Sequence, residues 1–169
     1  GDPEFSEVLF VTLVYTLGGS FFSILLGLTA ALLLHEQFPG RSLLRGLLIS
    51  PYIAPVVAVT FTWSFILDPQ LGVLNWVAVK NGLLSQPVPF LSQRFLDLEF
   101  MGRTWRLPLA LTTVILFEGW RYFPFAFLFV LARRQSIPED LYQAASVDGA
   151  GPLRRFVHIT LPQLSAVLA

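Results

Sequence analysis

The stretch from Val8 to Leu34 reads VLFVTLVYTLGGSFFSILLGLTAALLL and contains no charged side chain. As a helix it is about 40 Å long, which is enough to cross the hydrocarbon core of a bilayer with some tilt. It also contains small residues, which let helices approach closely in lipid: Gly18, Gly19, Ser20, Ser23 and Gly27. The stretch predicts a transmembrane helix.

The composition of the whole chain agrees with this prediction. Of 169 residues, 54% are hydrophobic and 13% are charged, and the mean hydropathy is +0.67. Soluble domains carry about 25% charged residues, and a chain this short has too much surface to bury so many apolar side chains. This composition argues against a soluble globular enzyme and excludes an intrinsically disordered protein.

Further apolar stretches follow the first, so the predicted fold class is an all-α, polytopic membrane protein. A second span covers about 46–67 and contains Pro51 and Pro55, which membrane helices tolerate. A third covers about 107–132, and a fourth begins at about 159 and stops at 169. We expect three full spans and the start of another.

The two ends of the chain suggest processing. Residues 1–5, Gly-Asp-Pro-Glu-Phe, resemble the remnant of a cleaved tag and are set aside, so that the predicted membrane domain covers 6–169. The last apolar stretch has about half the length that a span needs. We therefore expect a fragment of a longer polytopic protein.

Basic residues in the connecting segments predict the orientation, because cytoplasmic loops are enriched in Lys and Arg. The connectors 35–45 and 133–158 share one side of the membrane and 68–106 lies on the other. The first pair contains Arg41, Arg45, Arg133, Arg134, Arg154 and Arg155; the other contains Lys80, Arg94, Arg103 and Arg106. This excess places 133–158 in the cytoplasm.

The segment 133–158 has the signals of two short helices. Ser136 is suited to an N-cap with Glu139 three residues later, as in a capping box, and Pro138 suits a first helical turn. A helix over 138–147 would end near Gly149, which can adopt a positive φ, and Pro152 suits the start of a second helix. The segment is either a cytoplasmic recognition element or a plain connector between two spans.

Several segments of the chain resemble those of a known protein family. The segment is similar to the cytoplasmic signature loop of binding-protein-dependent ABC importer permeases, whose pattern is Glu-Ala-Ala, three residues, Gly, and later Ile-x-Leu-Pro. It matches at Ala144, Ala145, Gly149, Ile159, Leu161 and Pro162, and departs at Gln143, where the family has Glu. The Asp148-Gly149-Ala150 stretch, residues 68–75 and residues 120–125 resemble the carbohydrate-uptake branch.

The resemblance implies an inner-membrane permease subunit in a bacterial or archaeal cell, with the coupling loop at 133–158. The implied partners are a second permease subunit, two copies of a cytoplasmic ATPase subunit and an extracytoplasmic solute-binding protein. The implied ATPase-coupling residues are Gln143, Ala144, Ala145, Asp148, Gly149, Ala150, Phe156, Ile159 and Pro162. Asp148 either caps the second short helix or meets a basic residue of the partner.

The chain itself has no recognisable catalytic site. It contains no G-x-x-x-x-G-K-[ST] phosphate loop, so ATP and Mg²⁺ are expected on the partner ATPase and no cofactor on this chain. Without cysteine, and with His35 and His158 far apart in sequence, the chain has no metal-site pattern. The zero net charge gives no electrostatic footprint for nucleic acid.

A few residues within the spans are candidates for the solute pathway. Glu118 and Arg121 share a helical face, and ionisable groups in a span are costly unless they are used or paired. They either bind solute, with Trp120, Tyr122 or Phe123 stacking on a sugar ring, or form an ion pair that fixes packing. Pro51 and Pro55 either open a helix that lines the solute pathway, as in many transporters, or only shape the packing of the span.

Two other functions remain as alternatives to a permease of this family. A secondary carrier or channel would not need the signature loop, and a structural membrane anchor would need neither the prolines nor the charged residues in its spans. An ABC importer permease accounts for the signature loop, for the prolines and for the charged residues within the spans.

Overall fold

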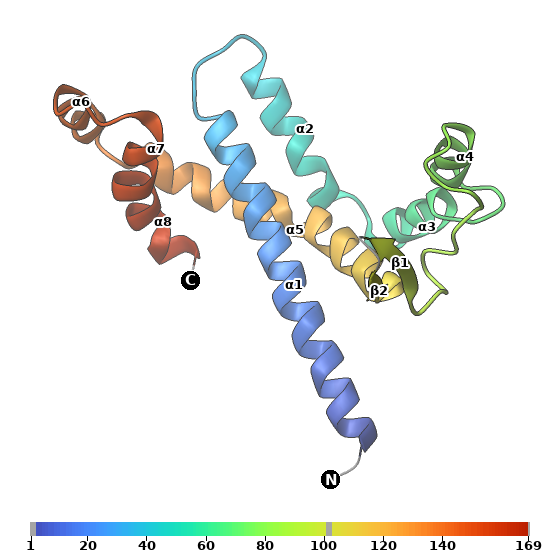
Figure 1. Cartoon of the computed structure of the whole chain (residues 1–169). Coiled ribbons are helices and arrows are strands. Elements are labelled where there is room, and N and C mark those ends of the chain that lie inside the picture. The colour runs from blue at the N-terminus through green and yellow to red at the C-terminus, as the bar shows by residue number, and fades with distance from the viewer. Residues whose placement is uncertain (1–2, 101–102, 169) are drawn as a thin grey trace. The chain divides into compact units, whose positions relative to one another are not determined.

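A computed structural model describes residues 3–100 and 103–168 (Figure 1). Its helices and strands, in order, are α1 (Pro3–Leu33), α2 (Arg41–Ile53), α3 (Val56–Ile66), α4 (Val73–Lys80), β1 (Leu96–Phe100), β2 (Arg103–Leu107), α5 (Leu109–Gln135), α6 (Glu139–Val147), α7 (Pro152–Arg155), the π-helical turn η1 (Phe156–Thr160) and α8 (Leu161–Leu168). Residues 1–2 of the predicted tag remnant and residue 169 of the predicted fourth span lie outside the described residues.

The fold is mostly helical, as predicted. Among the described residues, α1 and α5 are each long and apolar enough to cross a membrane. Helix α1 already begins at Pro3, so that the described part of the predicted tag remnant is helical. Helix α5 starts at Leu109, later than the predicted third span, and continues to Gln135. The fourth predicted span comprises the end of η1 and α8.

The predicted second span, about 46–67, consists of two helices in the structure. Helix α2 ends at Ile53 and α3 begins at Val56, and together they form a third span only if the broken pair is taken as one. The break falls at Pro55, which is extended, with φ −56° and ψ 123°. Proline disfavours the helical conformation of the residue before it and donates no hydrogen bond. Pro51, in contrast, is buried inside α2.

The all-α prediction also missed a β-hairpin in the connector 68–106. Strands β1 and β2 are antiparallel, with Leu96 opposite Leu107 and Phe100 opposite Arg103. Asp97 pairs across the strands with Arg106, whose Nε lies 3.3 Å from the carboxylate Oδ1. The alternation of apolar and acidic residues over 96–100 is the signal for a strand, and the all-α prediction did not use it.

The chain forms two compact units, residues 1–20 with 53–118 and residues 21–52 with 119–169. In the first, the buried Asn75 holds the segment after α3, because its Nδ2 donates to Val88 O at 3.0 Å and its Oδ1 accepts from Val88 N–H at 2.8 Å. In the second, a buried cluster joins α1, α5 and α8; it comprises Ala31, Leu34, Phe127, Val130, Leu131 and Leu164.

Within the second unit, small residues let α1 and α5 pack closely, as the sequence predicts. A Cβ atom on Gly27 would lie 2.7 Å from both Ala126 Cβ and Phe127 N. A Cβ atom on Gly119 would lie 2.4 Å from Phe22 Cδ1. In lipid, where apolar burial supplies no driving force between helices, such close backbone packing holds spans together.

Candidate functional site

The site with the most definite geometry is the segment between α5 and α8, in which α6, α7 and η1 follow the C-terminal end of α5 (Figure 1). Arg133, near the end of α5, fixes the far end of the segment. Its Nε donates to Gln163 O and its Nη2 to Gln163 Oε1, both at 2.9 Å. The two ends of the segment are therefore tied together.

The predicted capping box at the start of α6 is wrong. Ser136 Oγ donates to Arg133 O at 2.8 Å, within the last turn of α5. Helix α6 begins at Glu139 after an extended Pro138, with no side-chain cap. Because α5 runs on to Gln135, Ser136 lies at the end of one helix rather than at the start of the next.

The predicted turn after α6 is confirmed. Gly149 has φ +76°, a conformation that L side chains rarely adopt. Gly149 N–H donates to Ser146 O at 3.1 Å and Ala150 N–H to Ala145 O at 2.8 Å, which is the Schellman arrangement that ends many helices. Helix α7 then starts with Pro152 in its first turn, as predicted.

The outer side of α6 presents small and polar side chains to the surface. Gln143, Ala144 and Asp148 are exposed, and Val147 is 88% exposed, whereas Ala145 and Ala150 are half-buried. The N-cap of α7 is Gly151, which no side chain caps, so the alternative in which Asp148 caps that helix is wrong. In the described structure the Asp148 carboxylate makes no ion pair.

An apolar depression of about 450 Å³ lies along α7 and the following turn, over residues 151–158. Leu153, which is 77% exposed, lines it together with Gly151, Pro152, Arg154, Val157 and His158. Phe156 does not share this depression; it is half-buried and faces a different cavity. Among the remaining predicted coupling residues, Ile159 is half-buried and Pro162 is exposed.

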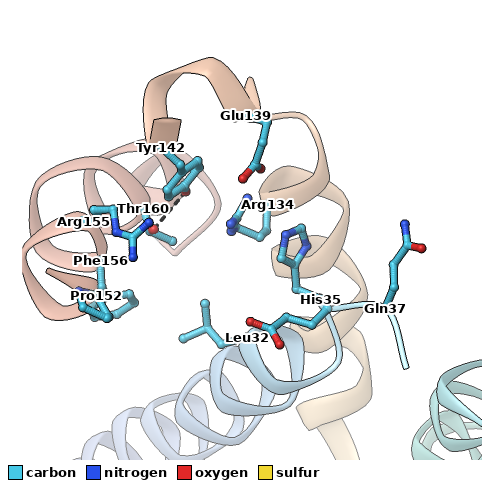
Figure 2. A pocket seen from close by; sticks show the side chains of 11 residues that line it. Leu32, His35, Gln37, Arg134, Glu139, Tyr142, Pro152, Arg155, Phe156 and Thr160 are labelled. Carbon is cyan, nitrogen blue, oxygen red and sulfur yellow. Dashed lines mark hydrogen bonds between the residues drawn. The ribbon is translucent and has the colours of Figure 1, made fainter. Parts of the chain in front are cut away.

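The inner side of α6 faces a cavity of about 720 Å³ at the ends of α1 and α5 (Figure 2). Tyr142 is buried, and its hydroxyl lies 2.9 Å from Thr160 Oγ1. The Arg134 guanidinium lies over the Tyr142 ring, 4.2 Å from its centroid. Nothing in the sequence pattern singled out Tyr142 and Thr160 as a pair, because they lie in different helical segments.

His35, just after α1, faces the same cavity (Figure 2). Burial lowers the pKa of its imidazole, and the nearby Arg134 lowers it further, while Glu139 opposes this shift. Its Nδ1 is buried without a hydrogen-bond partner in the described part of the chain.

The candidate pathway residues are divided between the two units. Arg121 Nη1 donates to the Tyr122 hydroxyl at 3.1 Å, and the expected alternative of an ion pair between Arg121 and Glu118 is not formed in the described structure. Glu118 and Trp120 are half-buried. A residue that the sequence interpretation did not select, Tyr52, follows Pro51 and places its ring 6.3 Å from that of Tyr122.

Three comparisons with known proteins bear on these sites. A family model described as "Binding-protein-dependent transport system inner membrane component" matches residues 23–169. The Escherichia coli K12 inner membrane ABC transporter permease protein YcjO is 34% identical over 99% of this chain and 53% of its own length. The trehalose/maltose transport system permease protein MalF of Thermococcus litoralis is 33% identical over 98% of this chain and 51% of its own.

A solved structure gives the same result for the fold. The crystal structure of a bacterial alginate ABC transporter, in complex with an alginate pentasaccharide-bound periplasmic protein, matches with a TM-score of 0.71 and 26% identity, over 91% of this chain and 50% of that one. The chain thus spans about half the length of the curated relatives it matches.

Proposed function

The chain belongs to the family of binding-protein-dependent transport system inner membrane components, and from this premise we propose that it forms the coupling half of an ABC importer permease. Its relatives are named as permease proteins of transport systems, so it is a transporter subunit of the inner membrane and not an enzyme. In the proposed complex, a second permease subunit and two copies of a cytoplasmic ATPase subunit accompany it. ATP and Mg²⁺ belong to the ATPase.

The observation that carries this proposal is the shape of α6. A short helix ends in a Schellman turn at Gly149 and presents Gln143, Ala144 and Asp148 to the surface. The small Ala144 side chain lets another protein approach the helix backbone closely, and the apolar depression along α7 offers a further surface. Asp148, with no cation partner in the described structure, is available to a basic group of the ATPase.

The mechanism follows from the requirement for two states. ATP can drive transport only if the ATPase holds the permease differently in its open and closed forms. A rigid α6 would pass that difference through Phe156, Ile159 and Pro162 into α8. Gln143 keeps hydrogen-bonding capacity in place of the family's Glu but carries no charge, so any contact that it makes is not a salt bridge.

For the solute, we propose a sugar or a related polyol or glycerol phosphate, delivered by an extracytoplasmic binding protein. The names of MalF and of the alginate transporter, a disaccharide system and a polysaccharide system, support a carbohydrate. In this chain, the cluster of Arg121, Tyr122 and Tyr52 combines a cation with aromatic rings, a combination that suits sugar hydroxyls and ring faces. Glu118, Trp120, Pro51 and Pro55 remain candidates for the same pathway.

The experiment uses the full-length permease reconstituted with its ATPase and binding protein. Gly149→Pro cannot adopt φ +76° and loses the N–H that bonds Ser146 O, and Ala145→Trp places a large ring on α6. Both should abolish solute-dependent ATP hydrolysis while membrane insertion stays intact.

The matched control for this experiment is Gly46→Ala in α2, where an added Cβ meets nothing within 4 Å. It should hydrolyse ATP like the wild type. Wild-type coupling in both loop variants would overturn the docking role of α6. Uptake that persists without the ATPase would favour a secondary carrier or channel.

A further inference from the structure

The inner side of α6 carries a contact that its outer, docking side does not explain. Tyr142 is 7% exposed and Thr160 is 4% exposed, and their hydroxyl oxygens lie 2.9 Å apart (Figure 2). A buried hydroxyl pair loses its contact with water, so breaking the pair leaves a polar group unsatisfied. The bond is therefore a specific link between α6 and η1.

Thr160 lies at an irregular turn of the chain, so this hydrogen bond connects α6 to a structurally distinct position. Thr160 is the last residue of η1, where Leu161 N–H bonds to Phe156 O, five residues earlier. Pro162 lies two residues after Thr160, and in a regular helix its ring would clash with the carbonyl four residues before it. The wider π-helical turn accommodates this proline, and such turns are local irregularities that frequently occur at functional sites.

The other end of the link is fixed by α5. The Arg134 guanidinium lies 4.2 Å from the centroid of the Tyr142 ring, a favourable cation–π geometry that gains strength away from water. Arg134 belongs to the last turn of α5. A second bond, from Arg155 Nη1 to Ser146 Oγ at 2.9 Å, joins the end of α6 to α7.

We propose that the Tyr142–Thr160 hydrogen bond, held under Arg134, locks α6 to the π-helical turn before α8, so that Tyr142 and Thr160 are positioning residues for coupling. The inference rests on the proposed function and names the contact that transmits it. When the ATPase moves α6, the displacement reaches the turn at 156–160 through this bond. Without the bond, α6 can move while α8 stays in place.

The test compares two substitutions at one site. Thr160→Val keeps the shape of the side chain and removes its hydroxyl, whereas Thr160→Ser keeps the hydroxyl. In the full-length permease, reconstituted with its ATPase and binding protein, the number of solute molecules imported per ATP hydrolysed is measured. We expect Thr160→Val and Tyr142→Phe each to lower this ratio about fivefold, the equilibrium change that one hydrogen bond typically supports. Thr160→Ser should keep the wild-type ratio.

Two further variants distinguish loss of the Tyr142–Thr160 bond from a general loss of stability. The double variant Tyr142→Phe/Thr160→Val should be no worse than either single variant, because all three lack the same bond. Thr29→Val removes a hydroxyl that donates to Leu25 O within its own helix and should leave the ratio unchanged. Hydrogen exchange in 139–148 should be faster in Thr160→Val than in Thr160→Ser.

Two results would overturn the inference: a wild-type ratio in both Thr160→Val and Tyr142→Phe, or an equal loss in Thr160→Ser and Thr160→Val, which would indicate packing alone. If the proposed function itself is wrong, the experiment gives a different result. In that case the wild-type permease would neither bind the ATPase nor show solute-dependent hydrolysis, whatever residue stands at 160.

Discussion

At the scale of single residues, backbone conformation and burial decide most of what the site presents. Gly149 ends α6 because φ +76° suits glycine, and an added Cβ there would meet no atom within 4 Å. Position 149 therefore requires glycine for its backbone conformation and not for lack of space. Gly72 differs, because a Cβ atom there would lie 2.3 Å from Asp68 O and 2.6 Å from Ile66 O, so its requirement is steric.

His35 gives a prediction for pH dependence at the residue scale. Its pKa is lowered from 6.5 in the folded protein, chiefly by burial, so the unfolded chain binds a proton more readily. Stability from this group is fully present above pH 6.5 and declines as the pH falls below it. We expect a lower thermal unfolding midpoint at about pH 5.5 than at about pH 7.5.

The control for this pH prediction is His35→Gln, which should reduce the difference between the two midpoints. His158→Gln removes the other histidine and monitors general effects of substitution. A pH difference that is unchanged in His35→Gln would contradict the assignment to His35.

At the scale of elements, helix packing depends on where small residues fall along a span. Helices α1 and α5 both carry glycines at their contacts, but the contacts are not equally close. At Gly27 the facing atoms include backbone, while at Gly19 they are the Cβ and Cγ atoms of Glu118 at 4.0 Å. Backbone cannot move aside as a flexible side chain can, so Gly27 is the stricter position.

Gly27→Ala should therefore weaken the packing of α1 on α5, whereas Gly19→Ala in the same helix should be tolerated. The added methyl of Gly27→Ala would lie 2.7 Å from Phe127 N, and overpacking of this kind costs about 1–3 kcal/mol. The measurement is thermal unfolding of the full-length permease in detergent. Equal midpoints for the two variants would show that the α1–α5 contact is looser than described.

At the scale of the whole molecule, the apolar surface exceeds what this chain can bury by itself. Large side chains along α1 are exposed, including Phe10 at 65%, Leu17 at 67% and Phe21 at 69%. Lipid tails can cover such surface at no cost.

The predicted orientation is testable at this scale, because the chain has no native cysteine. Asp148→Cys in the loop and Leu83→Cys in the connector 68–106 introduce single exposed thiols. In intact spheroplasts, a membrane-impermeant maleimide should label Leu83→Cys and not Asp148→Cys, and both should react after permeabilisation. If Asp148→Cys alone were labelled before permeabilisation, the chain would have the opposite orientation in the membrane.

Sequence signals predicted the features that depend on neighbouring residues in the chain. They did not predict the features that depend on contacts between distant segments. The turn at Gly149 and the start of α7 at Pro152 depend on a few adjacent residues, and both were predicted. Ser136 was misassigned because the end of α5 depends on packing beyond the local pattern. The hydrogen bond from Arg121 to Tyr122, in place of an ion pair with Glu118, depends on rotamers that the spacing does not specify.

The sequence by itself determined that the protein is helical and resides in a membrane, because the transfer of long uncharged runs out of water depends on composition alone. It also determined the family, through a short motif whose residues are close in the chain. Only the tertiary structure decided which side of α6 is buried, that Pro55 breaks the second span, and that Tyr142 meets Thr160. These features depend on contacts between segments distant in sequence, or on a choice between a kink and a break that the pattern leaves open.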